Sequence, residues 1–378
     1  MKFLLRTLAA TLLILGLTVL GLILTNNQYL LKGVWATYLH GESSGTIDDI
    51  RFFDTRTIHA SDPKEWSLAE DYNTKELSSL LRSTLEETKS VAFLVVKNDK
   101  LVHEEYWDGY SDSSHSNSFS MAKSIITLLA QAAIQKGYIK SWDDYASAYL
   151  PELEGAYRNE LQLKHLSTMT AGLQWNEHYQ DPFDITAKAY YGPDVEQLLL
   201  NEVPVVNPPG ETWEYQSGAT QLLGLVVQRA TKQTLSQFAS EVLWTPIQAR
   251  WDAKWHLDHK DGVEIAYCCF NSNARDFARF GKLLINHGNW NGKPIIDSAF
   301  VAMATQPGAV NHYGYSFWID TDDHLTHVYQ MRGFLGQYII VIPEKDLVIV
   351  RLGHSRLDKK DEHPADFHII VDEVMKYF

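Results

Sequence analysis

The sequence NSFSMAKSIITLL, residues 117–129, passes from a polar run into an apolar one. From there, apolar residues recur at the three- and four-residue spacing that buries one face of a helix: Met121, Ile125, Leu128, Leu129 and Ala132. Lys136 and Gly137 then supply the usual signals for the end of a helix. We therefore predict a largely buried helix that begins at about Ser120.

Ser120 and Lys123 lie three positions apart at the start of this helix, so both side chains share one face and can touch. The free backbone N–H groups and the positive end of the helix dipole could stabilise an oxyanion there. The alternative is that Ser120 only caps the helix and that Lys123 reaches solvent, because this spacing often arises by chance. The pair is thus a candidate nucleophile with its activating amine.

Two predicted hairpins lie near opposite ends of the chain. VAFLVVKNDKLVHEEYWDGY, residues 91–110, and QYIIVIPEKDLVIVRLGH, residues 337–354, each contain two β-rich runs separated by a polar turn. Helical patterns fill the region between them and the C-terminus, at residues 193–202, 218–243, 274–288 and 365–378. We predict an α+β fold, an α/β sandwich whose antiparallel sheet is flanked by helices and carries a helical insertion.

The first 25 residues are more apolar than the rest of the chain. Lys2 and Arg6 precede the uncharged residues 7–25, which would form a helix of about 28 Å, close to the thickness of a bilayer core. No convincing signal-peptide cleavage site follows. We expect an inner-membrane anchor with the body on the periplasmic, extracytoplasmic side, or a secreted protein if the segment is cleaved.

These patterns divide the chain into three parts. Residues 1–27 are the expected anchor or uncleaved signal, and residues 28–85 are expected to be a linker that packs partly on the body. Residues 86–378 form the main domain, with a mainly helical portion at about 138–260.

Composition excludes one class of partner. The chain has 378 residues, 45% of them hydrophobic, and a formal net charge of −14 without a basic block, so we expect no nucleic-acid partner. Cys268 and Cys269 are adjacent, and we expect small core residues rather than a bridge or a metal site. His256 and His259 lack metal-ligand spacing and are expected in a solvated loop, so no metal is predicted.

A second serine motif is weaker. GESSG, residues 41–45, matches the nucleophile-elbow pattern at Ser43, but that elbow needs a strand before it and a helix after it. No helical pattern follows, so we interpret Ser43 as part of a polar turn.

Tyr215 stands at the start of another buried helix, in PPGETWEYQSGATQLLG, residues 208–224, where Ser217 or Gly218 can cap the helix. A tyrosine base needs its pKa of about 10 brought toward neutrality, which requires about 4 kcal/mol of phenolate stabilisation. A lysine ammonium in a dry cleft could supply it. The alternative is that Tyr215 is a packing residue.

Gly333 and Gly336 interrupt a strand-like run in VYQMRGFLGQYIIVIP, residues 328–343. A glycine within a strand often marks a bulge or a place where another group approaches the backbone closely. Both interpretations remain open from these residues alone.

The motifs SMAK, YQS and RGFLGQ, in this order, resemble those of the β-lactamase and penicillin-binding superfamily of SxxK serine hydrolases over residues 85–378. The similarity is greatest to class C β-lactamases, related esterases and 6-aminohexanoate-dimer hydrolases. The resemblance implies a β-lactamase/transpeptidase-like fold, with Ser120 as the nucleophile and Lys123 as the group that helps to deprotonate it. Tyr215 would relay a proton to the leaving group.

The resemblance also implies an oxyanion hole formed by the backbone N–H groups of Ser120 and Phe334, the residue after Gly333. Which of Lys123 and Tyr215 holds the proton at rest is left open.

Two positions at which this sequence differs from β-lactamases bear on the choice of substrate. β-Lactamases of this type usually carry asparagine where Ser217 stands and lysine where Met331 stands. Arg332 adds a positive charge, but on a strand its side chain should point to the face opposite its neighbours. The pattern is therefore more similar to the amide and ester hydrolases, and the expected cleft wall comprises Trp175, Tyr179 and Asp181.

The resulting hypothesis is a serine hydrolase that cleaves a small-molecule amide or ester, with a cell-wall peptide as one candidate, through an acyl-enzyme and without a cofactor. The alternative is a non-catalytic penicillin-binding-like sensor or cell-wall peptide binder on the same fold. A D-amino-acid peptidase differs only in its substrate.

Overall fold

A six-stranded antiparallel sheet forms the centre of the body in the computed structural model, which describes residues 1–179, 181–320 and 327–378. Its strand order is β3-β2-β12-β11-β10-β9. The strand bounds are β2 Ser90–Lys97, β3 Lys100–Tyr106, β9 Trp318–Asp320, β10 Val328–Gly333, β11 Gln337–Ile342 and β12 Leu347–Gly353. Since β2 pairs with β12, distant parts of the chain meet in one sheet, as predicted.

Both predicted hairpins are confirmed. Asn98 and Asp99 join β2 to β3, and both have positive φ, at 50° and 60°, as a tight hairpin turn with the twist of the strands requires. A 3₁₀ turn, Pro343–Lys345, followed by left-handed Asp346, joins β11 to β12.

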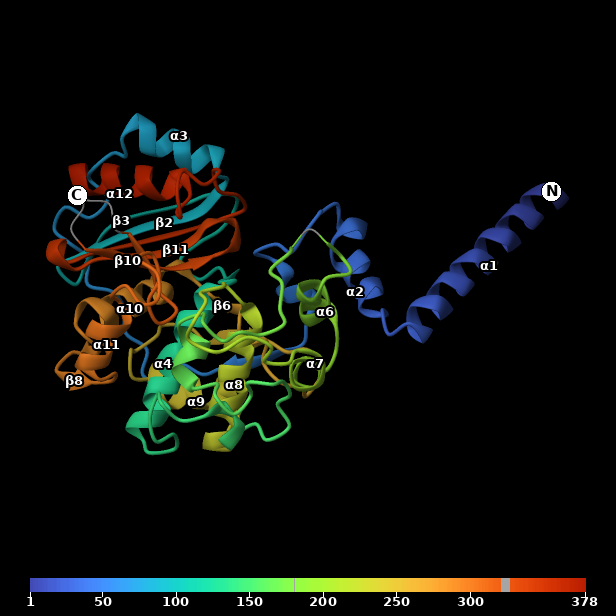
Figure 1. Ribbon diagram of the computed structural model, residues 1–378. Helices are drawn as coiled ribbons and strands as arrows, with labels where there is room; N and C mark the ends of the chain where they lie inside the picture. The colour runs from blue at the N-terminus through green and yellow to red at the C-terminus, as the bar shows by residue number, and fades with distance from the viewer. Residues whose placement is uncertain (180, 321–326) are drawn as a thin grey trace.

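Helices cover both faces of this sheet (Figure 1). On one face lie α3 (Ser79–Glu87) and α12 (Ala365–Tyr377), and on the other lie α10 (Ala274–Ile285) and α4 (Met121–Gln135). Because both faces are buried, the strands are continuously aliphatic rather than alternating. The predicted α/β sandwich is confirmed.

The helical portion is built around α4 and α8, which a few shorter helices surround (Figure 1). Its elements are α5 Leu163–Ser167, α6 Ile185–Tyr191, α7 Val195–Glu202, α8 Ser217–Thr231 and α9 Leu235–Ala239, followed by a π-helical turn, Ser240–Trp244. The helical pattern predicted over 218–243 is broken at Lys232, which is left-handed, and Thr234 caps the next helix. Outside this portion, α11 spans Ser298–Ala304.

A second, four-stranded sheet was not predicted. Its order is β1-β5-β6-β4, with β1 Thr55–Ile58, β4 Ser116–Asn117, β5 Ala253–His256 and β6 Phe270–Ser272. The segment 28–85 therefore contributes a strand to the body. The sheet ends on β4, just before Ser120. A separate two-stranded sheet consists of β7 Asn289–Trp290 and β8 Lys293–Pro294.

The prediction of a solvated loop is wrong for His256. This residue ends β5, is fully buried and stacks on Phe53 with ring centroids 4.6 Å apart. Burial lowers its pKa to about 3. Its stacking partner lies far away in sequence, so no local pattern signals its burial. His259 does lie in an exposed loop.

The two cysteines are buried as predicted, but the prediction that they form no bridge is wrong. Cys268 and Cys269 are joined in a disulfide between adjacent residues. Cys269 has a φ of +72°, so the backbone turns sharply there. The turn brings the two side chains to the same side.

The N-terminal helix α1, Lys2–Leu24, is exposed along its length and extends away from the body (Figure 1). Among the residues that the structure describes, it is the one helix long and apolar enough to cross a membrane. The next helix, α2 (Tyr29–Ala36), packs against α6. Two 3₁₀ turns follow, Tyr38–His40 and Asp49–Phe52, and between them Ser43 lies exposed outside any helix or strand, as predicted.

Candidate active site

Ser120 sits at the end of a tightly held turn that leads into α4. The carboxamide oxygen of Asn117 accepts the backbone N–H of Phe119 at 2.9 Å, and the N–H of Ser118 donates to the carbonyl of Phe270 in β6. Phe119 has a φ of +44°, a conformation that non-glycine residues adopt at a cost of about 1–3 kcal/mol. Ser120 occupies the N-cap position without a side-chain cap bond, so its hydroxyl is available for chemistry.

The side chain of Lys123 points into the interior. It is 1% exposed, and its Nζ donates to Ser120 Oγ and to the carbonyl oxygen of Tyr267, both at 3.0 Å. Desolvation lowers the pKa of Lys123 to about 8, although the carboxylate of Glu177 raises it in part. The alternative of a solvent-exposed lysine is therefore wrong.

Tyr215 lies on the other side of this pair. Its ring centroid is 5.0 Å from Lys123 Nζ, and Ser120 is close enough to affect the pKa of its hydroxyl. Burial, and then the charge of Glu177, raise the pKa of Tyr215 above its ordinary value, and the neighbouring Ser120 and the charge of Arg332 offset this rise only in part. The pKa moves away from neutrality, opposite to the sequence hypothesis, so Lys123 is the group whose proton is lost more readily.

Buried hydrogen bonds fix the backbone on either side of Tyr215. The preceding N–H, that of Glu214, donates to the carbonyl of Met169 at 2.8 Å. The following side chain, Gln216, is 1% exposed and exchanges hydrogen bonds with both backbone groups of Leu173.

Gly333 ends β10 directly against the turn that carries Ser120. A Cβ atom at Gly333 would lie 2.1 Å from the carbonyl oxygen of Ser118, so only glycine allows this close approach. The next residue, Phe334, packs its ring edge-on against Phe119 with centroids 5.6 Å apart. Gln337 fixes the turn by donating to the carbonyl of Phe334.

The two backbone N–H groups assigned to the oxyanion hole share one property. Among the residues that the structure describes, neither the N–H of Ser120 nor that of Phe334 donates to a protein acceptor. Both remain available to a negatively charged oxygen.

The prediction that Ser217 or Gly218 caps α8 is wrong, because Gln216 occupies the N-cap position. Instead, the backbone N–H of Ser217 donates to Glu177 Oε2 at 2.9 Å, and its hydroxyl donates to Glu177 Oε1. Glu177 thus places a carboxylate at the N-terminus of α8, where the helix dipole favours negative charge.

No pattern in the sequence pointed to Glu177. Two residues of the expected cleft wall also bind its carboxylate: Trp175 donates its indole N–H at 2.6 Å, and Tyr179 donates its hydroxyl at 2.5 Å. The ring of Tyr179 lies 5.6 Å from that of Phe334, which places it at the site. Asp181 instead accepts the N–H of Phe183 in a local turn.

Met331 and Arg332 point to opposite faces of β10, as expected for a strand. Met331 is fully buried in the core shared with α4, whereas Arg332 donates to the carbonyl of Glu362, close to the start of α12. The guanidinium of Arg332 also lies over the Trp318 ring, 3.3 Å from its centroid. The buried thioether of Met331 therefore stands where β-lactamases of this type usually carry a lysine amine.

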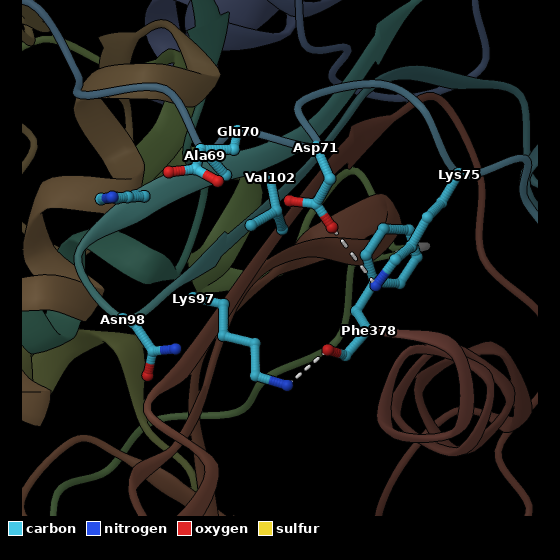
Figure 2. A pocket seen from close by; sticks show the side chains of 9 residues that line it. Ala69, Glu70, Asp71, Lys75, Lys97, Asn98, Val102 and Phe378 are labelled. Carbon is cyan, nitrogen blue, oxygen red and sulfur yellow. Dashed lines mark hydrogen bonds and ion pairs between the residues drawn. The ribbon is translucent and has the colours of Figure 1, made fainter.

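Figure 2 shows a surface hollow at the β3 edge of the sheet, lined by residues that do not belong to the candidate site. Three of the charged residues that line it already have partners: Lys75 lies 3.6 Å from Asp71, and Lys97 donates to the carbonyl of Phe378. Elsewhere in the part of the chain that the structure describes, no group of three or more histidine, cysteine or acidic side chains could hold a metal ion.

Comparisons with known proteins found a matching family, similar sequences and similar structures. The sequence model of the Beta-lactamase family matches residues 77–371. The 6-aminohexanoate-dimer hydrolase of Paenarthrobacter ureafaciens is 26% identical over 295 residues, 72% of this chain and 74% of that protein. A Bacillus anthracis structure assigned as a 6-aminohexanoate-dimer hydrolase has a TM-score of 0.76 at 22% identity, covering 91% of this chain and 95% of that one. A class C β-lactamase has a TM-score of 0.57 at 15% identity, covering 79% and 94%.

Proposed function

Because this chain belongs to the Beta-lactamase family, whose members are in general hydrolytic serine enzymes, we propose that it is a serine hydrolase that cleaves an amide or ester bond. The observation that carries this proposal is the 3.0 Å separation between the buried amine of Lys123 and the hydroxyl of Ser120. An amine with a pKa of about 8 is partly neutral near physiological pH and can accept a proton. The proposed hydrolase domain spans residues 86–378.

Acylation follows from the positions of the three side chains. Neutral Lys123 accepts the hydroxyl proton of Ser120 while the Ser120 oxygen attacks the substrate carbonyl carbon. The backbone N–H groups of Ser120 and Phe334 stabilise the resulting oxyanion. When the carbonyl re-forms, the bond to the leaving group breaks, the Tyr215 hydroxyl gives that group a proton, and Tyr215 regains one from Lys123.

In deacylation, water is the nucleophile and Ser120 is the leaving group. Water attacks the acyl carbon, and Lys123 accepts the proton that the water releases. The bond between the carbonyl carbon and Ser120 then breaks, and Lys123 returns the proton to the Ser120 oxygen. The products are a carboxylic acid and the free enzyme.

The side chains around Ser120 support linear amides or esters as substrates, rather than β-lactams. Met331 supplies no cation for a β-lactam carboxylate, and the hydroxyl of Ser217 is engaged with Glu177. The 26% identical relative from Paenarthrobacter ureafaciens is a 6-aminohexanoate-dimer hydrolase, and its name gives a dimer of 6-aminohexanoate as its substrate. Cell-wall peptides remain a candidate substrate class within this proposal.

We further propose that α1 anchors the protein in the inner membrane with the body on the extracytoplasmic side. The length and apolar composition of α1 support the span, and Lys2 and Arg6 before it support the orientation.

Turnover of an activated ester by the full chain tests the proposed activity. We expect continuous release of product by the wild-type protein and none by Ser120→Ala, with unchanged thermal unfolding as the check on the fold. A burst of one product per protein without further release would instead support a binder or sensor. Full activity in Ser120→Ala would overturn the proposal.

A further inference from the structure

Helix α2 is apolar on two opposite faces. Tyr29 and Ala36, 4% and 1% exposed, face the body. Leu31, Val34 and Trp35, spaced as one helical face, are 39%, 45% and 46% exposed. A surface helix ordinarily turns only one apolar face inward and presents polar residues to water.

Contacts with the body fix this orientation. The ring of Tyr191 on α6 packs against Gly33, where an added Cβ atom would lie 3.3 Å from the ring. The hydroxyl of Tyr29 donates to the carbonyl of Pro182 at 3.1 Å. The inner face is therefore committed to the body, and the outer residues cannot turn inward. Beside Pro182, Phe183 is also exposed.

The exposed apolar surface extends beyond α2. We define the outer face of α2 as its exposed apolar residues together with those of the 3₁₀ turn that follows: Leu31, Val34, Trp35, Tyr38 and Leu39. Soluble monomers rarely expose a contiguous apolar surface of this kind, and such surfaces mark contacts with membranes or other proteins.

The position of this face next to α1 indicates that its partner is the lipid bilayer. Helix α1 ends at Leu24 and α2 begins at Tyr29, so the connecting chain reaches at most about 17 Å even when fully extended. The backbone between them forms turns, which shortens the reach further. If α1 spans the bilayer, α2 must lie within or close to its headgroup layer.

The charges of this segment favour a lipid surface. The chain carries a net charge of −14, yet residues 25–41 contain no aspartate or glutamate, and Lys32 is the only lysine or arginine. A segment without acidic groups avoids repulsion by anionic lipids. Tryptophan and tyrosine, both present on the outer face, are enriched where proteins meet the membrane interface.

We propose that the outer face of α2 docks on the surface of the lipid bilayer beside α1. The Tyr29 hydroxyl of α2 donates to the carbonyl of Pro182, and the loop of Pro182 also carries Glu177 and Tyr179, which border the candidate site. Docking therefore holds one wall of the site at the membrane surface. The docking rests on the proposed membrane span of α1 and does not depend on the proposed hydrolysis.

Site-directed spin labelling of the full chain in nanodiscs of phosphatidylethanolamine and phosphatidylglycerol tests the inference. A nitroxide is attached at Val34→Cys and, as the control, at Leu80→Cys on α3, which covers the sheet on the far side from α4 (Figure 1). The native cysteines, Cys268 and Cys269, are buried and joined to each other, so the added thiol is the reactive one. Accessibility to oxygen and to a water-soluble nickel complex reports whether the label lies in lipid.

At position 34 we expect a ratio of oxygen to nickel accessibility several-fold higher than at position 80. Equal, water-like ratios would overturn the inference. Spin–spin broadening between labels at position 34 would also overturn it, because the outer face would then contact a second copy of the chain.

A charge introduced beside the label provides the second test. Leu31→Asp should lower the oxygen preference of the label at position 34, because a carboxylate opposes insertion into lipid. Leu80→Asp is the matched control and should leave that preference unchanged. An unaltered preference in Leu31→Asp would show that the outer face of α2 is not the docking surface. Thermal unfolding checks that each variant is folded.

Discussion

Lys123 is the side chain on which the proposed chemistry depends most, because it must be neutral to accept the proton of Ser120. It is 1% exposed, and the cost of desolvating its ammonium lowers its pKa to about 8. The hydrogen bond to the carbonyl of Tyr267 holds the amine in place beside Ser120.

The pH dependence of kcat/KM for an ester should report this pKa. Below about pH 8 Lys123 is protonated, so we expect the rate to rise about tenfold per pH unit and to level off above the pKa. Lys123→Arg keeps the positive charge but cannot lose it, and it should be inactive throughout. A flat profile between pH 6 and 9 would contradict the assignment of Lys123 as the base.

Glu177 offers a test of the local electrostatics. Its carboxylate raises the pKa of Lys123 against the larger effect of desolvation. Glu177→Gln removes that charge, so we expect the pKa of Lys123 to fall and the pH profile to shift toward acid. Glu241→Gln, in an exposed ion pair with Lys136, is the control and should not move the profile. An alkaline shift in Glu177→Gln would be inconsistent with this account.

Local spacing made some site residues predictable and left others hidden. Ser120 with Lys123, and Tyr215 before a helix, stand in motifs that a single segment displays. Glu177 could not be predicted, because a lone glutamate in a loop forms no periodic sequence pattern. Its partner Ser217 lies 40 residues further along the chain.

Among the elements, the end of β10 and the turn before α4 must approach closely to form the proposed oxyanion hole. Gly333→Ala would bring a methyl group into the carbonyl of Ser118, and the strand end carrying Phe334 would have to move. We expect kcat to fall by about tenfold or more, because a displaced oxyanion donor costs catalysis directly. Steady-state kinetics on the folded protein measures this effect.

Gly281→Ala is the matched control for that substitution. Its added Cβ atom would lie 2.3 Å from a methyl group of Val348, so it also overpacks the structure, but between α10 and the sheet. Both variants should unfold at lower temperature, whereas only Gly333→Ala should lose kcat. Equal kcat in the two variants would argue against a role for Gly333 in positioning Phe334.

Elements with a sustained pattern were predictable, and short ones were not. The hairpins and the helices α4, α10 and α12 carry long apolar patterns that local physics determines. The strands β1, β4, β5 and β6 have two to four residues each, and their pairing depends on partners far away in sequence. His256 was misplaced for the same reason.

At the scale of the whole molecule, the site lies where the two sheets and the helical portion meet. Ser120 follows β4 of the small sheet, Gly333 ends β10 of the large sheet, and Tyr215 precedes α8. A sheet assembled from both ends of the chain could be predicted from the two hairpins. The second sheet, which holds the turn before Ser120, could not, because its strands are short.

In the proposed reaction, the substrate's acyl group is transferred to Ser120. Mass spectrometry of the rapidly quenched full chain, mixed with an activated ester, measures this most directly. We predict a mass increase equal to the acyl group, located by peptide mapping on Ser120 and absent in Ser120→Ala. An adduct of the same size that maps to another residue, or that persists in Ser120→Ala, would show that Ser120 is not the acyl acceptor.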